Sequence, residues 1–136
     1  MKHFDGLLIM LLILAVQCRA QHPAKDSIEG TWKGTSLCKV RPSPCHDEDV
    51  VYHTSKTANA KSYIIQMNKI VSSAEEEMGS SDAVYDEGEH TLSSITRDRQ
   101  GRSGVWLFKI DDTQMHGTLT IDEKTLYQVI EIKKAD

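Results

Sequence analysis

The sequence predicts an all-β domain in which eight antiparallel strands run up and down in order and close into a barrel. Short stretches of apolar–polar alternation are bounded by turn residues, which is typical of strands. These stretches recur at roughly 8–12 residues with short connections, which favours pairing between consecutive strands. The alternative is a sandwich of seven or eight strands, but a Greek key needs a long crossover connection that the sequence does not contain.

We expect the strands at residues 29–37, 49–56, 61–71, 82–86, 91–96, 105–110, 114–121 and 126–133. Residues 72–79 (SSAEEEMG) are predicted to form one helical turn. A serine can cap its N-terminus, glutamates suit its first residues, and glycine suits the position after its end. The other connections are short and polar, as expected for turns between strands.

The first twenty residues have the pattern of a secretory signal peptide. A short basic start is followed by an unbroken apolar run of ten residues at 7–16. Cys18 and Ala20 are small residues at the positions that signal peptidase requires. The apolar run is too short to span a bilayer. Cys18 could instead be the lipidated cysteine of a bacterial lipoprotein, but Gln17 is bulky where a small residue is needed.

Cleavage after Ala20 divides the chain into a signal peptide (1–20), an N-terminal tail (21–27) and a single barrel domain (28–136). We therefore expect a secreted protein, extracellular or periplasmic, with no membrane span after signal removal.

The cysteine count predicts one disulfide bond. Cys18 leaves with the signal peptide, so Cys38 and Cys45 remain as a pair in an oxidising compartment. The alternative is a metal site made by these cysteines with the adjacent residues 46–48 (His-Asp-Glu). Structural zinc sites favour paired short spacings, of which only one half is visible here. We predict the disulfide and no metal.

The first expected strand carries the sequence IEGTWK at residues 28–33. Its Gly30 and Trp32 resemble the G-x-W opening strand of lipocalins and intracellular fatty-acid-binding proteins, together called calycins. The resemblance implies a lipocalin-like barrel in which Trp32 packs over one end, with Gly30 and Trp32 as structural residues. Two features depart from the fatty-acid-binding proteins: the first two strands have no helical lid between them, and the last strand lacks an arginine beside Tyr127. We therefore expect neutral ligands to bind at least as well as fatty acids.

In a barrel of this size, inward side chains can form the core, the lining of a cavity, or both. His116 alternates with Met115 and is expected to face outward. The candidate lining residues are Tyr63, Ile65, Met67, Trp106, Phe108, Met115, Leu119 and Tyr127.

No catalytic or cofactor motif is visible. The histidines show no H-E-x-x-H spacing, and no G-x-S-x-G elbow is present. The acidic run 75–77 is expected to be solvated in a turn. A formal net charge of −4 without a basic stripe argues against nucleic-acid binding. Arg97, Arg99 and Arg102 gather beside Asp98, where they either bind an anion or are simply solvated.

Two functions follow from this pattern. The first is a secreted, lipocalin-like binding protein that holds a small apolar or amphipathic molecule inside the barrel, without catalysis or a cofactor. The second is a secreted or periplasmic protein-binding module or enzyme inhibitor, with a packed barrel, that acts on a protein partner through its loops. A cavity of roughly 300 Å³ or more favours the first. A filled interior with an exposed apolar or charged patch favours the second.

Overall fold

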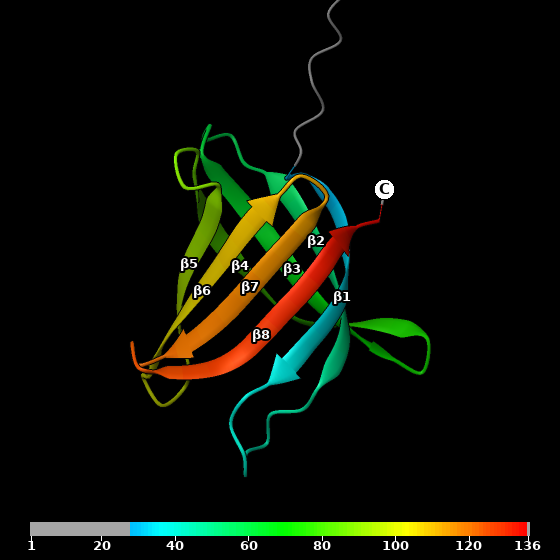
Figure 1. Ribbon diagram of the computed structural model, residues 1–136, viewed down its shortest axis with the longest axis vertical. Coiled ribbons are helices and arrows are strands. Elements are labelled where there is room, and N and C mark those ends of the chain that lie inside the picture. Colours follow the sequence, from blue (N-terminus) through cyan, green and yellow to red (C-terminus); the bar gives the residue numbers. More distant parts are fainter. Residues whose placement is uncertain (1–27, 136) are drawn as a thin grey trace, which may run out of the picture.

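A computed structural model describes residues 28–135, which form a closed barrel of eight antiparallel strands (Figure 1). Each strand pairs with the next, and β1 pairs with β8 to close the barrel. The predicted up-and-down meander is confirmed. The predicted signal peptide and tail lie outside the described residues. The strands are β1 (Gly30–Cys38), β2 (Glu48–Lys56), β3 (Ser62–Val71), β4 (Ala74–Asp86), β5 (Thr91–Arg97), β6 (Ser103–Asp111), β7 (Gln114–Ile121) and β8 (Thr125–Lys134).

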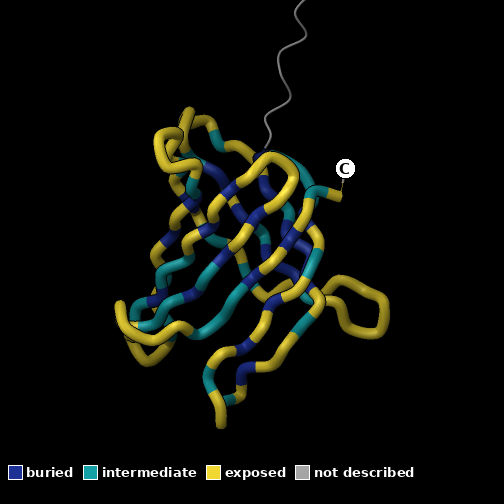
Figure 2. The backbone as a smooth tube through the Cα atoms, viewed as in Figure 1, coloured by how far each residue is buried: buried dark blue, intermediate teal, exposed yellow. Residues whose placement is uncertain are grey.

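The strand bounds lie within two residues of the predicted ones, except at the start of β4. Buried and exposed positions alternate along most of the strands, while the turns and the β3–β4 hairpin are largely exposed (Figure 2). In β7, for example, Met115 faces the core and His116 faces solvent. Across residues 28–135, no helix has the length and apolar character needed to cross a membrane.

The predicted helical turn at 72–79 is wrong, because β4 begins at Ala74 and pairs with β3 from Ala74 to Val84. Ser72 and Ser73 have φ values of 50° and 66° and form the tight turn of a hairpin. Two consecutive positive φ values suit the twist of a hairpin, and the strand pairing gives residues 74–79 hydrogen-bond partners that one helical turn lacks. The acidic run 75–77 consequently lies on a strand. Figure 1 shows this hairpin projecting beyond the barrel wall.

The end of the barrel at which β1 begins, here called the closed end, is filled by large side chains. Trp32 has no exposed surface, and its Nε1 donates hydrogen bonds to the Ile28 carbonyl (3.0 Å) and to Thr54 Oγ1 (3.2 Å). The Nζ atom of Lys134 lies 4.8 Å from the centre of the Trp32 ring. Burial raises the pKa of the Tyr52 phenol, and the nearby Glu48 carboxylate adds to the shift. The largest fully buried side chains are Trp32, Tyr52, Phe108, Ile65, Leu92, Met115, Ile130 and Val50.

Two glycines make close packing possible around this core. Gly34 lies where β1 meets β8, and a Cβ atom there would overlap the carbonyl group of Glu131. On β7, a Cβ atom at Gly117 would lie 2.5 Å from the ring of Phe108. Barrel closure and the seating of Phe108 therefore both require a position without a side chain.

Candidate ligand-binding site

The opposite end of the barrel, at which β1 finishes, is here called the open end, and several of its inward positions are small residues. They include Gly79 and Ser81 on β4, Ser94 and Thr96 on β5, and Gly104 on β6. The backbone pairing of β4 with β5 is confined to three positions, between 84–86 and 91–93. Nearer the open end, the two strands are joined through a hydrogen bond between the hydroxyl groups of Ser81 and Ser94. Small residues and diverging strands leave space in this half of the barrel.

The first space, here called the apolar hollow, has a volume of 220 Å³. Its walls include Met67, Met78, Gly79, Ser81, Trp106 and Gln128. The Trp106 ring stacks on Phe108, with ring centres 5.9 Å apart and planes 2° from parallel. Because Phe108 is fully buried, the packed core holds one side of the Trp106 ring and leaves the ring as a firm wall of the hollow.

The second space, here called the charged hollow, has a volume of 290 Å³. It shares Thr96 and Trp106 with the apolar hollow, so the two spaces adjoin. Its other walls are Arg97, Asp98, Arg102, Gly104, Leu119, Ile121 and Tyr127. The open end therefore contains an apolar space and a charged space, which meet at Thr96 and Trp106.

Asp98 holds Arg102 in a fixed position at the rim of the charged hollow. Arg102 Nε donates to Asp98 Oδ2 at 2.6 Å, and Asp98 Oδ1 accepts from the backbone N–H groups of Gln100 and Arg102, both at 2.9 Å. Partial burial acts to raise the pKa of Asp98, but the hydrogen bonds and the charge of Arg102, together with the hydrogen bond from the Gln100 backbone, outweigh it, so this pKa is below its usual value. The hydrogen bond to Asp98 also raises the pKa of Arg102. The guanidinium therefore stays charged and oriented.

Two irregularities in strand pairing aim side chains at the open end. On β4, Gly79 pairs with Met67 and Glu77 pairs with Asn68, which leaves Met78 as an extra residue. On β8, Tyr127 is the extra residue, because Gln128 pairs with Leu119 while Leu126 pairs with Thr120. A β-bulge re-aims the side chain of its extra residue. Met78 accordingly lines the apolar hollow and Tyr127 lines the charged one.

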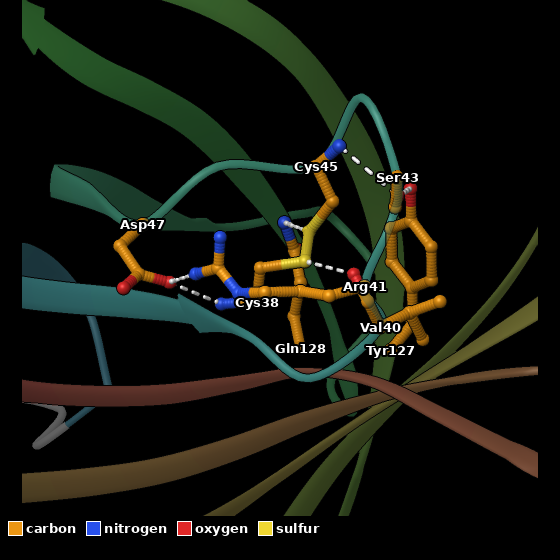
Figure 3. The surroundings of a disulfide bond; sticks show 8 residues. All are labelled: Cys38, Val40, Arg41, Ser43, Cys45, Asp47, Tyr127 and Gln128. Atoms are coloured by element: carbon orange, nitrogen blue, oxygen red, sulfur yellow. Dashed lines mark hydrogen bonds and ion pairs between the residues drawn. A yellow bond between two sulfur atoms is a disulfide. The ribbon is translucent and has the colours of Figure 1, made fainter.

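The loop between β1 and β2 contains the disulfide bond between Cys38 and Cys45 that the sequence predicts (Figure 3). The two Cα atoms are 5.8 Å apart. Asp47 Oδ1 accepts hydrogen bonds from the Cys38 backbone N–H (2.8 Å) and from Arg41 Nη2 (3.2 Å), which closes the loop a second time. Because the two sulfurs are bonded to each other, they are not thiolate ligands for a metal.

This loop contacts residues of both hollows, as Figure 3 shows. The hydroxyl groups of Ser43 and Tyr127 lie 3.2 Å apart. The side-chain amide of Gln128 donates to Cys45 Sγ at 3.8 Å. The disulfide-closed loop thereby supports the bulged segment of β8.

The eight candidate lining residues divide into two groups. Met67 lines the apolar hollow, Trp106 lines both hollows, and Leu119 and Tyr127 line the charged one. The other four pack in the buried core and are absent from the walls of these two hollows: Tyr63, Ile65, Phe108 and Met115.

Several other lining residues were not predicted from the sequence, and three of them show why. Thr96 could have been found from the alternation of β5, where it follows Leu92 and Ser94 on the inward face. Met78 was hidden by the wrongly predicted helical turn. Gln128 is polar, and selecting apolar residues for an interior overlooks such a position.

Comparison with known proteins shows which known fold the barrel resembles. No protein-family model and no curated protein sequence match this chain. Among solved structures, a crystal structure of a mutant of the fluorescent protein UnaG is similar, with a TM-score of 0.54 and 13% sequence identity. The similarity covers 81% of this chain and 97% of that one. Together with the closed eight-stranded barrel, it shows the lipocalin-like, calycin-type fold that the G-x-W strand suggested; at this identity it concerns the fold alone.

Proposed function

We propose that this chain is a secreted binding protein, without catalytic activity, that holds a small apolar or amphipathic molecule at the open end of its barrel. The observation that carries the proposal is the uneven filling of the barrel. The closed end is packed by large side chains around Trp32, whereas the open end contains two adjoining hollows of 220 and 290 Å³. A water molecule has a share of about 30 Å³ in the liquid, so the two adjoining hollows together have room for a small organic molecule.

The chemistry of the walls favours an apolar or flat group in the apolar hollow. Met67 and Met78 have flexible thioether side chains that adapt to the shape of a ligand. Trp106 presents a ring that is already held in place by Phe108. Burying apolar ligand surface against such walls contributes about 25 cal/mol per Å².

Secretion is supported by two features of the sequence. The first twenty residues have the pattern of a signal peptide, and the bonded pair Cys38–Cys45 suits an oxidising compartment. An extracellular or periplasmic binding protein would act as a carrier or scavenger of a compound that is poorly soluble in water. The alternative function, a packed barrel acting on a protein partner, is less well supported because the open half is not filled.

A fluorescence titration with the neutral dye N-phenylnaphthylamine tests the proposal. The wild-type protein should increase the dye emission in a saturable way. Thr96→Phe should weaken binding about tenfold or more, because Thr96 is a wall of both hollows and the larger side chain fills them. Ser93→Phe is the matched control, since Ser93 is an exposed residue that faces outward on the same strand.

The control variant should bind the dye as the wild type does. If the folded wild-type protein does not bind the dye, or if Thr96→Phe and Ser93→Phe bind it equally well, the proposed binding function is wrong. Circular dichroism of each variant shows whether the barrel remains folded.

A further inference from the structure

We infer that the preferred ligand is an amphipathic anion, with its apolar part in the apolar hollow and its acid group beside Arg97 and Arg102. This inference rests on the proposed function and goes further by naming the ligand class. It also reverses the expectation that neutral ligands bind at least as well as acids. That expectation followed from the absence of arginine in the last strand, but the end of β5 and the loop after it bring Arg97 and Arg102 to the open end instead.

The size of the hollows is the first argument. Sites for small organic ligands usually have at least about 300 Å³, which is more than the 220 Å³ of the apolar hollow. The charged hollow adjoins it through Thr96 and Trp106. A ligand of ordinary size therefore extends past Trp106 and brings one end to the arginines.

The free hydrogen-bond donors of Arg102 are the second argument. Asp98 occupies only the Nε edge of the guanidinium, at 2.6 Å. Within residues 28–135, no hydrogen bond to the Nη groups of Arg102 is present, so those donors are open to a ligand. Asp98 thus positions the Arg102 guanidinium and leaves the donors of its Nη groups free. A planar guanidinium with free donors matches the oxygen atoms of a carboxylate or sulfonate.

The charge balance of the hollow is the third argument. Its walls carry two guanidinium groups and one carboxylate, so Asp98 balances only one of the arginines. Arg97 makes one long hydrogen bond, 3.4 Å from Nη1 to the Gly101 carbonyl oxygen. Asp122, which also acts on Arg102, lies outside these walls and accepts from the Ser103 backbone N–H at 3.2 Å. A site with surplus positive charge favours an anion, although the whole chain has a formal net charge of −4.

A matched pair of dyes tests the inference. Anilinonaphthalene sulfonate (ANS) and N-phenylnaphthylamine have the same aromatic skeleton, but only ANS carries an acid group. The wild-type protein should bind ANS about tenfold more tightly than the neutral dye, the size expected for a charge-assisted hydrogen bond. Arg102→Gln should remove most of that preference, weakening the binding of ANS far more than the binding of the neutral dye.

Two further variants make the test specific. Arg97→Gln should also weaken ANS binding. Because Arg97 does not pair with Asp98, this variant tests the inference even if Arg102→Gln disturbs the loop. Arg99→Gln removes the same charge from the same loop but lies outside the hollow walls, so it should bind both dyes as the wild type does. Equal loss of ANS binding in Arg99→Gln would indicate a general charge effect and would overturn the inference.

The remaining outcomes separate the inference from the proposed function. If the neutral dye binds as tightly as ANS and the arginine variants change neither affinity, the binding function stands and the anionic ligand class is wrong. If neither dye binds the folded protein, both the binding function and the ligand class are wrong.

Discussion

The hydroxyl groups of Ser43 and Tyr127 lie 3.2 Å apart although the residues are 84 positions apart in sequence. Ser43 belongs to the loop closed by the disulfide, and Tyr127 is the extra residue of the β8 bulge. The Lys39 backbone N–H also donates to the Tyr127 carbonyl at 2.8 Å. A loop far from the charged hollow in sequence therefore holds one of its walls in place.

Tyr127→Phe should lower the free energy of unfolding by about 0.5–1.5 kcal/mol, the usual net value of one hydrogen bond. Ser43→Ala should cost more, because Ser43 Oγ also accepts from the Cys45 backbone N–H at 3.1 Å. In urea denaturation, the double variant should be less destabilised than the two single changes added together, since both remove the same contact. Strict additivity would show that the two hydroxyl groups do not interact.

Trp32→Ala should destabilise the barrel by ~3–5 kcal/mol, the range for truncating a fully buried aromatic side chain. Trp32 has no exposed surface and donates two hydrogen bonds at the closed end. Trp106→Ala is the comparison, because Trp106 is only half-buried and should cost less stability while weakening dye binding more. A loss below ~1 kcal/mol for Trp32→Ala would contradict a structural role for this residue.

Gly117→Ala should destabilise the protein by ~1–3 kcal/mol, since the added methyl group would overpack the core against the Phe108 ring. Movement of Phe108 should also change the emission of Trp106, which stacks on it. Phe108→Leu removes the ring atoms that the methyl group meets, so Gly117→Ala should cost less in that background. Thermal unfolding of the four proteins measures this coupling, and an equal cost in both backgrounds would contradict the predicted clash.

Glu75 should make the barrel sensitive to acid. Hydrogen bonds from His53 Nε2 (2.7 Å) and Asn68 Nδ2 (2.6 Å) lower its pKa, and the charges of His53 and Lys33 act in the same direction. A carboxyl group whose pKa is lower in the folded state contributes stability above its ordinary pKa of about 4.3 and loses it as the pH falls through the lower folded value.

Glu75→Gln should therefore reduce the loss of stability measured by urea denaturation between about pH 5 and about pH 3. Glu76→Gln removes a carboxylate from the same hairpin, where Glu76 pairs with Lys69 at 3.5 Å, and controls for the change in net charge. The same acid sensitivity in wild type and Glu75→Gln would contradict a role for this carboxylate.

Much of the barrel was predictable from local sequence, because side-chain alternation along a strand is a local property. The period of two indicated the strands and their inward faces, including the positions of Met67 and Trp106. The pairing of Cys38 with Cys45 followed from the cysteine count and the expected compartment. The G-x-W pattern at Gly30 and Trp32 indicated the type of fold. The order of the strands in the barrel could also be predicted, because consecutive strands with short connections pair with each other.

The binding site depended on contacts between strands, which no local pattern contains. The segment SSAEEEMG is compatible with a helical turn, and only its partners on β3 make it a strand. The bulges that aim Met78 and Tyr127 at the open end arise where two neighbouring strands fall out of register. The volume of each hollow likewise depends on which small residues from different strands meet at one level of the barrel. Most of the strands are determined by the local alternation of side chains, whereas the start of β4 and the space between strands are determined by contacts between strands.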